Sequence, residues 1–499
     1  MADRVVGDNI ARASLEALVR ELLRENAELK RREEELIRRH EELAQRNEEL
    51  TRRVAALERE LAAAKKDSSN SSKPPSGDLG KPTSGDITDG RASRPRRKRG
   101  GQPGHPKHER SSFPSDKVDH VETHTLSACP DCGGTLKKLK SKTRVTQQAE
   151  LVAAPIRVEE HRCETYACCR CGRTQVAPLP ASIEAGGLLG PRLTAIVGYM
   201  KGACHASYTT IAKYFKDVLG LTLSRGFLAK IIRKMTRAIG PACDALRRRL
   251  PSEARINSDE TGHRENGRRA WTWCFRAEDF ALFKISDSRG SNVIGEHLGA
   301  AYQGILCCDY FSAYRKYMKV AGARVQFCLA HLIRDLKYLE TLPDEPTVVY
   351  AGCLRTVMQR VFGTIHRREQ LTPKGYLRSL RGQRSKFIAL ATRDVPDTPE
   401  ARNMARRFER HADAYFEFID SPIATPTNNL AEQSIRHVVI DRRITQGTRG
   451  DVGRAWCERI WTVLATCAQQ GRSAFAFLQD AIDAQFTQRP APMLIEIPN

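Results

Sequence analysis

Leucine recurs at every seventh position near the start of this 499-residue chain, and this repeat predicts that the first segment is a pairing helix. With leucine at heptad position d, the a positions include Asn26 and Asn47. Leucine at d with asparagine at a is typical of a parallel dimer in fixed register. We therefore predict a leucine-zipper coiled coil over residues 10–65 that forms a homodimer; a solvated single helix is the alternative. The repeat consists of Leu15, Leu22, Leu29, Leu36, Leu43, Leu50 and Leu57.

The next segment, residues 66–118, is rich in serine, proline, glycine and basic residues. Such a composition does not bury enough apolar surface to fold alone, so we predict a disordered basic linker. Within it, the run Arg94-Pro-Arg-Arg-Lys-Arg99 is typical of an arm that contacts nucleic-acid phosphates. A charge run that only increases solubility is the alternative.

Two C-x-x-C pairs, each followed by glycine, come next in the chain. Four thiolates on two such turns form the tetrahedral ligand set of a structural zinc ion and leave no position open for water. We predict a zinc ribbon-like unit over residues 119–185, with Cys163 and Cys169 as additional thiols; free or redox-active cysteines are the alternative. The predicted zinc ligands are Cys129, Cys132, Cys168 and Cys171.

The charge balance favours a polyanionic partner, because 82 lysines and arginines against 59 acidic residues give a net charge of +23. A membrane is disfavoured, since no apolar run approaches the roughly 20 residues that a spanning helix needs. Met1 is followed by polar and charged residues without an export signal. We therefore expect a cytoplasmic protein that faces nucleic acid and whose 15 cysteines are reduced or bind metal.

Residues 186–250 have the apolar spacing of helices. One helix is predicted over Tyr208 to Leu219 and a second over Phe227 to Ile239, with a glycine-containing turn between them. This arrangement resembles a helix-turn-helix, whose second helix enters the DNA major groove; a plain helical hairpin is an equal alternative. In the DNA-binding interpretation, four cations on or near the second helix would face DNA: Lys230, Arg233, Lys234 and Arg237.

After Pro251 the apolar residues alternate as in strands. Three strands are expected first, followed by helix, strand, helix, strand and helix, which is the order of the ribonuclease H-like fold. The predicted class is therefore multidomain α/β, with a catalytic domain over residues 251–441, a helical insertion at about 342–424 and a helical tail at 442–499. The expected strands are residues 254–259, 270–275, 280–285, 304–309 and 324–328.

This topology selects two aspartates, because Asp259 ends the first expected strand and Asp309 ends the fourth, which is its neighbour in that sheet. A third carboxylate is expected from a later helix, and Glu432 supplies one on a helix with Asn428 or Asn429 as its N-cap. Carboxylates suit Mg²⁺ or Mn²⁺, and two such ions clamp the attacking and leaving oxygens of phosphoryl transfer. Four other acids remain candidates: Glu260, Asp287, Asp335 and Glu417.

Several short motifs follow one another in a fixed order along the chain. After the zipper, they are Ser71-Ser-Lys-Pro-Pro-Ser76, Gly100-Gly-Gln-Pro-Gly-His105, the two cysteine pairs, Asp259-Glu-Thr261, Asp309-Tyr-Phe-Ser-Ala-Tyr314, Cys328-Leu-Ala-His331-Leu-Ile-Arg334 and Asn428-Asn-Leu-Ala-Glu432. In these motifs the chain resembles, over nearly its whole length, the transposases of the insertion-sequence-66 family (TnpC type).

The resemblance implies a DDE-type DNA transposase that cuts the ends of a mobile element and joins them to target DNA. It places the family's metal-binding acids on Asp259, Asp309 and Glu432. Cys328 and His331 match a C-x-x-H element that supports the active site, where His331 would contact phosphate or orient Asp309; a satisfied histidine at a helix start is the alternative. The implied setting is the bacterial cytoplasm at the nucleoid, with accessory proteins of the same element as candidate partners.

Some residues around Glu432 depart from the family pattern. Thr427 stands before the asparagine pair and Gln433 after the glutamate, and residues 441–449 are altered as well. Two rival functions therefore stay open: a DNA-binding protein with an inactive nuclease fold, and a metal nuclease without strand transfer. The stretch still offers cations near the expected site: Arg436, Arg442, Arg443 and Arg449.

Overall fold

The computed structural model describes residues 2–66, 114–118, 121, 156–167 and 174–496. The basic run and the four predicted zinc ligands lie outside the described residues. The chain divides into two compact units. The first consists of Met1–Gly80, Pro180–Ile211 and Arg225–Asn499, and the second of Lys81–Leu179 and Ala212–Ser224.

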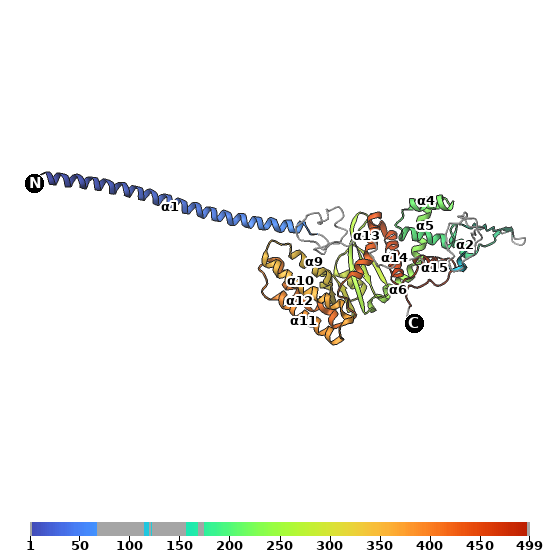
Figure 1. Cartoon of the computed structure of the whole chain (residues 1–499). Coiled ribbons are helices and arrows are strands. Elements are labelled where there is room, and N and C mark those ends of the chain that lie inside the picture. Colours follow the sequence, from blue (N-terminus) through green and yellow to red (C-terminus); the bar gives the residue numbers. More distant parts are fainter. Residues whose placement is uncertain (1, 67–113, 119–120, 122–155, 168–173, 497–499) are drawn as a thin grey trace, which may run out of the picture. The chain divides into compact units, whose positions relative to one another are not determined.

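The first segment is one continuous helix, α1 (Ala2–Ala64), as the heptad repeat predicts (Figure 1). The leucines of the repeat are all exposed, from 51% at Leu22 to 65% at Leu36. Ion pairs one turn apart, such as Arg32 with Glu28 at 2.9 Å, support the helix along its polar faces. An exposed apolar stripe of this length is what a coiled coil would cover, so pairing with a second copy stays a prediction.

In the second unit the described strands are β1 (Thr165–Ala167) and β2 (Thr174–Val176), which pair antiparallel. They flank residues 168–173, where two of the predicted zinc ligands fall. The short helix η2 (Ser115–Lys117) belongs to the same unit, and most of α4 (Tyr208–Leu219) does too. The bounds of α4 are those that the sequence predicts.

A five-stranded sheet in the order β5-β4-β3-β6-β7 forms the centre of the first unit. The first three strands are antiparallel, whereas β6 and β7 run parallel to β3. All four residues of β6 are buried, as expected for the interior of a sheet. The strands are β3 (Arg255–Glu265), β4 (Arg268–Arg276), β5 (Ala281–Ser286), β6 (Ile305–Cys308) and β7 (Arg324–Phe327).

One predicted strand end is wrong, because β3 does not stop at Asp259 but continues to Glu265. The parallel pairing with β6 ends at Asn257, yet β3 goes on pairing with β4 as far as the hairpin turn. That turn is Asn266-Gly267, and both residues have positive φ, 50° and 77°. An Asn-Gly pair suits the left-handed conformations of a two-residue hairpin, so the turn residues account for the longer strand.

Four helices lie next to the strands that carry the predicted acids. The helix α7 packs against α8, α9 follows β7 directly, and α13 packs on β3 and β4. Tyr314 of α8 also bonds Glu260 of β3 at 2.8 Å, so both α8 and α13 contact the strand that carries Asp259. The helices are α7 (Ser291–Leu298), α8 (Ser312–Ala321), α9 (Leu329–Leu339) and α13 (Asn429–Thr445).

The predicted insertion is helical and begins each of its long helices with a side-chain cap (Figure 1). Asp344, Thr372 and Thr398 accept backbone N–H bonds at these helix starts, and proline follows in the first turn each time. Buried Gln326 of β7 holds the insertion, bonding Tyr415 O at 3.0 Å and Phe418 N at 2.9 Å. The elements are α10 (Glu345–His366), η5 (Arg368–Gln370), α11 (Pro373–Thr392) and α12 (Pro399–Asp420).

A second helical group contains the predicted second DNA-binding helix, α5, which packs against α3, α14 and α15. Its cations Lys230, Arg233 and Arg237 are exposed. Lys234 instead donates to Ala185 O at 2.6 Å, near the end of α2. The group comprises α2 (Ala181–Gly186), α3 (Pro191–Gly202), α5 (Arg225–Ala238), α6 (Gly240–Arg249), η4 (Leu250–Ser252), α14 (Gly450–Gln469) and α15 (Ala474–Phe486).

The helix α14 covers the outer strand β5 with hydrogen bonds from its side chains. Thr466 accepts the N–H of Ala281 at 3.2 Å, Thr462 that of Phe283 at 3.1 Å, and Glu458 that of Ile285 at 2.8 Å. Four residues of a helix rise about 6.0 Å and two residues of a strand about 6.6–6.8 Å, so the spacings match. The helix thereby satisfies a sheet edge that would otherwise be open to another chain.

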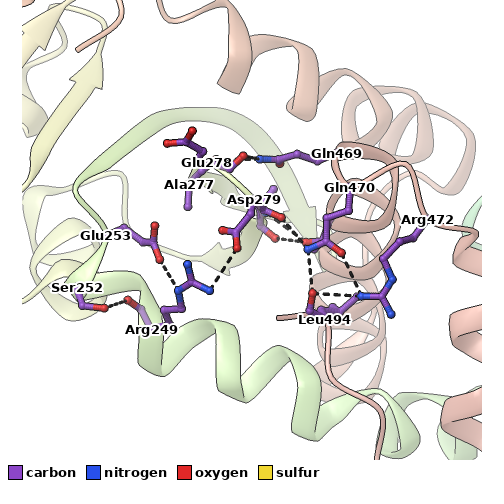
Figure 2. A network of polar contacts seen from close by, with 12 residues as sticks. Arg249, Ser252, Glu253, Ala277, Glu278, Asp279, Gln469, Gln470, Arg472 and Leu494 are labelled. Atoms are coloured by element: carbon purple, nitrogen blue, oxygen red, sulfur yellow. Dashed lines mark hydrogen bonds and ion pairs between the residues drawn. The ribbon is translucent and has the colours of Figure 1, made fainter. Parts of the chain in front are cut away.

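Residues 442–499, predicted as a tail, are thus joined to the sheet, and the expected boundary at 441/442 falls inside α13. Figure 2 shows a second connection, around the turn between β4 and β5. There Gln470 donates to Asp279 O at 2.9 Å and to Leu494 O at 2.8 Å, while Arg249 pairs with Glu253 at 2.6 Å. Among the described helices, none has the length and apolarity to cross a membrane.

Candidate active site

The two predicted aspartates belong to neighbouring segments: Asp259 lies in β3, and Asp309 directly follows the last residue of β6. Asn257 of β3 pairs with Cys307 of β6, and each aspartate comes two residues after the paired residue of its segment. One oxygen of each carboxylate is fixed by a backbone N–H bond. Asp259 accepts the N–H of Glu260 at 3.0 Å, and Asp309 accepts that of Phe311 at 2.9 Å.

The electrostatic environment of both aspartates favours the protonated carboxyl. Burial raises the pKa of Asp259 well above its usual value, and the charges of Glu260, Asp309 and Glu432 raise it further. Burial also raises the pKa of Asp309, to about 7, with Glu260 as the next cause and Arg289 acting in the opposite direction. Carboxylates forced together in this way are stabilised by a cation, which is the physical requirement of a metal site.

The third predicted acid, Glu432, lies in the first turn of α13 and faces α9. Its Oε1 is 3.6 Å from His331 Nδ1, and its Oε2 is 3.6 Å from Arg334 Nη2. Arg334 also donates to His331 Nε2 at 3.3 Å. The pKa of His331 is lowered by burial, so the imidazole is neutral near pH 7. The described contacts of His331 therefore connect it to the third acid.

The sequence analysis missed the role of the Asn428 side chain. Asn428 is the N-cap residue of α13, as predicted, but its side chain does not cap the helix. It donates to Ser258 O at 2.7 Å and accepts from Asn257 Nδ2 at 3.1 Å, while its backbone N–H donates to Cys328 Sγ at 3.2 Å. One buried residue thus links β3, the start of α9 and the start of α13, the elements that carry Asp259, His331 and Glu432. A pair of asparagines before a helix signals a cap and gives no indication of these tertiary bonds.

Most of the other candidate acids form ion pairs with arginines. Glu260 accepts from Arg289 at 2.7 Å and from the hydroxyl of Tyr314 at 2.8 Å. Asp335 pairs with Arg407 at 2.7 Å, Glu417 pairs with Arg324, and Asp287 is exposed. Glu260 nevertheless borders the site, since its charge raises the pKa of both aspartates.

One set of three donors comes close enough to share a metal ion in the described part of the chain. Cys328, His331 and Glu432 have ligand atoms that all lie within 4.8 Å of one another. Asp259 and Asp309 are not members of that set. Glu432 therefore interacts with two groups: its charge acts on Asp259, and its carboxylate lies close to Cys328 and His331 of the C-x-x-H element.

The altered stretch 441–449 supports the far end of β3. Thr448 donates its N–H to Arg264 O at 2.9 Å, and its hydroxyl bonds the buried His263 at 3.0 Å. Gly447 has φ 101°, and a Cβ there would lie 2.1 Å from Arg264 O, so only glycine fits. Arg442 donates to Thr261 at 3.0 Å, and it is held against the strand rather than free in solution. These residues have a structural role that the comparison of motifs does not indicate.

Residues 186–455 match the sequence pattern of a known family, the Transposase IS66 family. This segment spans the sheet, Asp259, Asp309 and Glu432, and it makes up more than half of the chain. The chain belongs to the IS66 transposase family. The zinc-finger binding domain of transposase IS66 matches residues 127–172, and a family of unknown function matches residues 7–111.

Two relatives of this family member are uncharacterized proteins of Sinorhizobium fredii (strain NBRC 101917 / NGR234). The protein y4jD is 24% identical over 383 residues, which is 71% of this chain and 74% of the relative. The protein y4hP is 24% identical over 427 residues, 78% of this chain and 76% of the relative.

Membership in the IS66 family makes this chain a transposase of an insertion sequence, an enzyme class that processes DNA. The zinc-finger match covers the four predicted cysteine ligands, which supports structural zinc and DNA as the partner. The sheet and its helices supply the mixed α/β architecture that was predicted.

Proposed function

We propose that this IS66 family member is a DDE-type transposase with a ribonuclease H-like core, which cuts the ends of its element and joins them to target DNA. The observation that carries the proposal is that Asp259 and Asp309 follow the paired residues of β3 and β6 and that the charge of Asp309 raises the pKa of Asp259. Glu432 supports it as the third acid, because its charge raises the pKa of Asp259. The strand order, three antiparallel strands followed by two parallel ones, supports the assignment of the core.

Asp259, Asp309 and Glu432 fit a pair of Mg²⁺ or Mn²⁺ ions. They offer oxygen donors, and both aspartates have a raised pKa that a nearby cation would reverse. When bound, such ions polarise the phosphate and activate the attacking oxygen, first of water and then of a DNA 3′ end. Structural zinc belongs to the proposed Cys129, Cys132, Cys168 and Cys171 set.

The protein's own groups orient these acids. The backbone N–H bonds to Asp259 and Asp309 fix one oxygen of each carboxylate. Arg289 neutralises Glu260 and so limits the negative charge that a DNA phosphate would meet. Exposed cations on α13 and after it, Arg436 and Arg449, are placed to attract the phosphate backbone.

The remaining segments would hold DNA and a second subunit. In this proposal the zipper at residues 10–65 forms a parallel homodimer, and the basic linker, the zinc unit and the 186–250 helices bind the terminal repeats. A dimer provides two active sites for two element ends. The proposed setting is the nucleoid in the bacterial cytoplasm, with accessory proteins of the same element as further partners.

The direct test is cleavage of end DNA by purified protein. Asp259→Asn, Asp309→Asn and Glu432→Gln should each lower Mg²⁺-dependent cleavage by at least about 100-fold, since metal stabilisation of the transition state contributes several kcal/mol. Binding of end DNA, measured by fluorescence anisotropy, should stay within about twofold. Asp287→Asn removes an exposed acid of the same domain and serves as the matched control. A variant that cleaves like the wild type would remove its residue from the proposed site.

A strand-transfer assay with pre-nicked ends separates the rival functions. A transposase yields joined products, a metal nuclease yields cuts alone, and an inactive DNA-binding protein yields neither.

A further inference from the structure

We propose that Cys328, His331 and Glu432 form a binding site for a thiophilic divalent cation of the zinc class, and that an ion bound there withholds Glu432 from the two aspartates. The site lies where α9 begins and where the first turn of α13 approaches it. Ion binding stands by itself, whereas its effect on DNA cleavage rests on the proposed function.

The spacing of the three donors fits a small tetrahedral ion. Their ligand atoms all lie within 4.8 Å of one another, and His331 Nδ1 is 3.6 Å from Glu432 Oε1. Zinc binds sulfur at about 2.3 Å and nitrogen or oxygen at about 2.0–2.2 Å, which separates tetrahedral donor atoms by about 3.3–3.8 Å. The His331–Glu432 pair already has this separation, so a small inward movement of the most distant donor would complete the set.

A second observation indicates a missing cation at the same place. His331 Nδ1 and Glu432 Oε1 are both buried and have no hydrogen-bond partner. Their side chains are only 12% and 21% exposed, and buried polar atoms without partners are rare and destabilising. One ion between the two atoms would satisfy both.

Burial raises the pKa of the Cys328 thiol to about 11, and backbone donors around the sulfur partly oppose this rise. The sulfur is buried, and it accepts the backbone N–H of Asn428 at 3.2 Å. The backbone N–H groups of Ala330 and His331, in the first turn of α9, also bond to this sulfur. These donors would stabilise a thiolate once an ion takes the place of the thiol proton, which passes to solvent.

The donor set selects zinc over magnesium. Thiolate and imidazole ligands suit Zn²⁺, while Mg²⁺ and Mn²⁺ prefer oxygen ligands such as the two aspartates. Because Glu432 lies between these groups, an ion held by Cys328 and His331 and an ion pair held by the aspartates would compete for one carboxylate.

Arg334 supplies positive charge in place of the ion. Its Nη2 lies 3.6 Å from Glu432 Oε2, and its Nη1 donates to His331 Nε2 at 3.3 Å. That bond makes Nε2 an acceptor, so in the neutral imidazole the proton resides on Nδ1. Binding an ion at Nδ1 therefore moves this proton through solvent to Nε2 and displaces Arg334. The arginine and the ion exclude each other.

The experiment counts zinc in the full-length protein after equilibration with Zn²⁺ and removal of the excess. The wild type should hold one zinc ion more per chain than Cys328→Ser or His331→Gln, because the zinc unit contributes equally to all three. Each variant should weaken the second site at least about 100-fold, since even the outer partners of metal ligands change affinity by about 10- to 100-fold. Cys467→Ser, which removes a buried thiol of α14, should keep the wild-type count.

Arg334→Gln provides the sharper test, because it should tighten zinc binding by about tenfold while the ligand variants weaken it. An arginine that only supports the fold would not have this effect. Glu432→Gln is a further ligand variant, and it removes no contact shorter than 3.6 Å. Circular dichroism verifies that each protein is folded. Equal zinc counts in the wild type and all ligand variants would overturn the site.

Cleavage assays then separate this proposal from the proposed function. Added Zn²⁺ should inhibit Mg²⁺-dependent cleavage by the wild type, and Cys328→Ser should resist the inhibition. If the wild type binds the additional zinc ion but Zn²⁺ does not inhibit its cleavage of DNA, the proposal that the two metal sites compete for Glu432 is wrong. Extra zinc in a protein that never cleaves DNA would overturn the proposed function and leave the zinc site standing.

Discussion

Two buried polar clusters in this transposase differ in how completely their hydrogen bonds are satisfied. The carboxylate of Asp441 accepts from Trp461 Nε1 at 3.0 Å and contacts His205 Nδ1 at 3.0 Å, with 7% of its side chain exposed. Glu432, nine residues earlier on the same helix, has only contacts of 3.6 Å and one buried oxygen without a partner. The satisfied cluster holds helices together, whereas the unsatisfied one retains capacity for a ligand. The comparison locates function more sharply than burial or charge alone.

The largest effect on stability is expected at the satisfied cluster. Asp441→Ala leaves His205 and Trp461 with buried nitrogen atoms that lack a partner, so the free energy of unfolding should fall by about 3–5 kcal/mol. Thermal and urea unfolding measure the change. A loss below about 1 kcal/mol would show that the cluster contributes little and would remove the contrast with Glu432.

The second expected effect concerns the buried His263, whose Nε2 bonds Thr448 while its Nδ1 has no hydrogen-bond partner. Burial lowers the pKa of His263 from 6.5 to about 4, with the charge of Arg442 as the next cause. The unfolded chain therefore takes up the proton first, and stability is lost as the pH falls from about 6.5 to about 4, by up to about 3 kcal/mol. His263→Gln should flatten the dependence of the melting temperature on pH in this window; an unchanged slope would assign it to other groups.

The third effect, of opposite sign, belongs to Asp309. Because the pKa of Asp309 is about 7 in the folded protein and about 3.8 in the unfolded chain, the folded form keeps the proton to higher pH. Its contribution is full below 3.8 and is lost as the pH rises through 7, so the metal-free protein should lose about 1.4 kcal/mol between pH 6 and 8. Asp309→Asn should abolish this loss. Mn²⁺ should raise the melting temperature more at pH 8 than at pH 6, and an equal rise would contradict the proposed metal site.

The smallest effect on stability is expected at Glu432 itself. Glu432→Gln breaks no contact shorter than 3.6 Å, so the free energy of unfolding should change by less than about 1 kcal/mol. The same substitution is expected to abolish cleavage. A variant that keeps its stability but loses activity would distinguish Glu432 from the structural carboxylate Asp441. A loss of stability as large as that of Asp441→Ala would place Glu432 among the structural carboxylates.

The sequence was sufficient to place the strands and to indicate a helical insertion, because these follow from local patterns. Alternating apolar residues indicate strands, and the caps at Asp344, Thr372 and Thr398 begin helices where side chains accept backbone N–H bonds. The end of β3 was placed six residues too early, because the run of buried residues before Asp259 stops while the hairpin pairing continues. Pairing partners, and not local composition, decide where such a strand ends.

The sequence predicts the candidate site as three acids and a C-x-x-H element with Cys328 and His331, without the contacts that hold them. Asp259 and Glu260 are adjacent and chemically alike, and only the positions of Arg289 and Tyr314 show that Glu260 already has partners. The connection of Asn428 to Ser258 joins residues 170 positions apart, and no spacing in the sequence encodes it. Side chains that bond across such separations depend on the folded backbone, which explains why the sequence suggests candidate acids but not the bonds of Asn428.

The cover that α14 provides for β5 has a consequence for the synthesis of the chain. Ala281 of the strand and Thr466 of the helix lie 185 residues apart, so at about 5–20 residues per second the edge waits roughly 10–40 seconds for its cover. Asp259, Asp309 and Glu432 have all been synthesised before that interval ends. A copy of the gene that is cut short soon after Glu432 would therefore still encode every acid, yet its product would expose an uncovered strand edge and tend to aggregate.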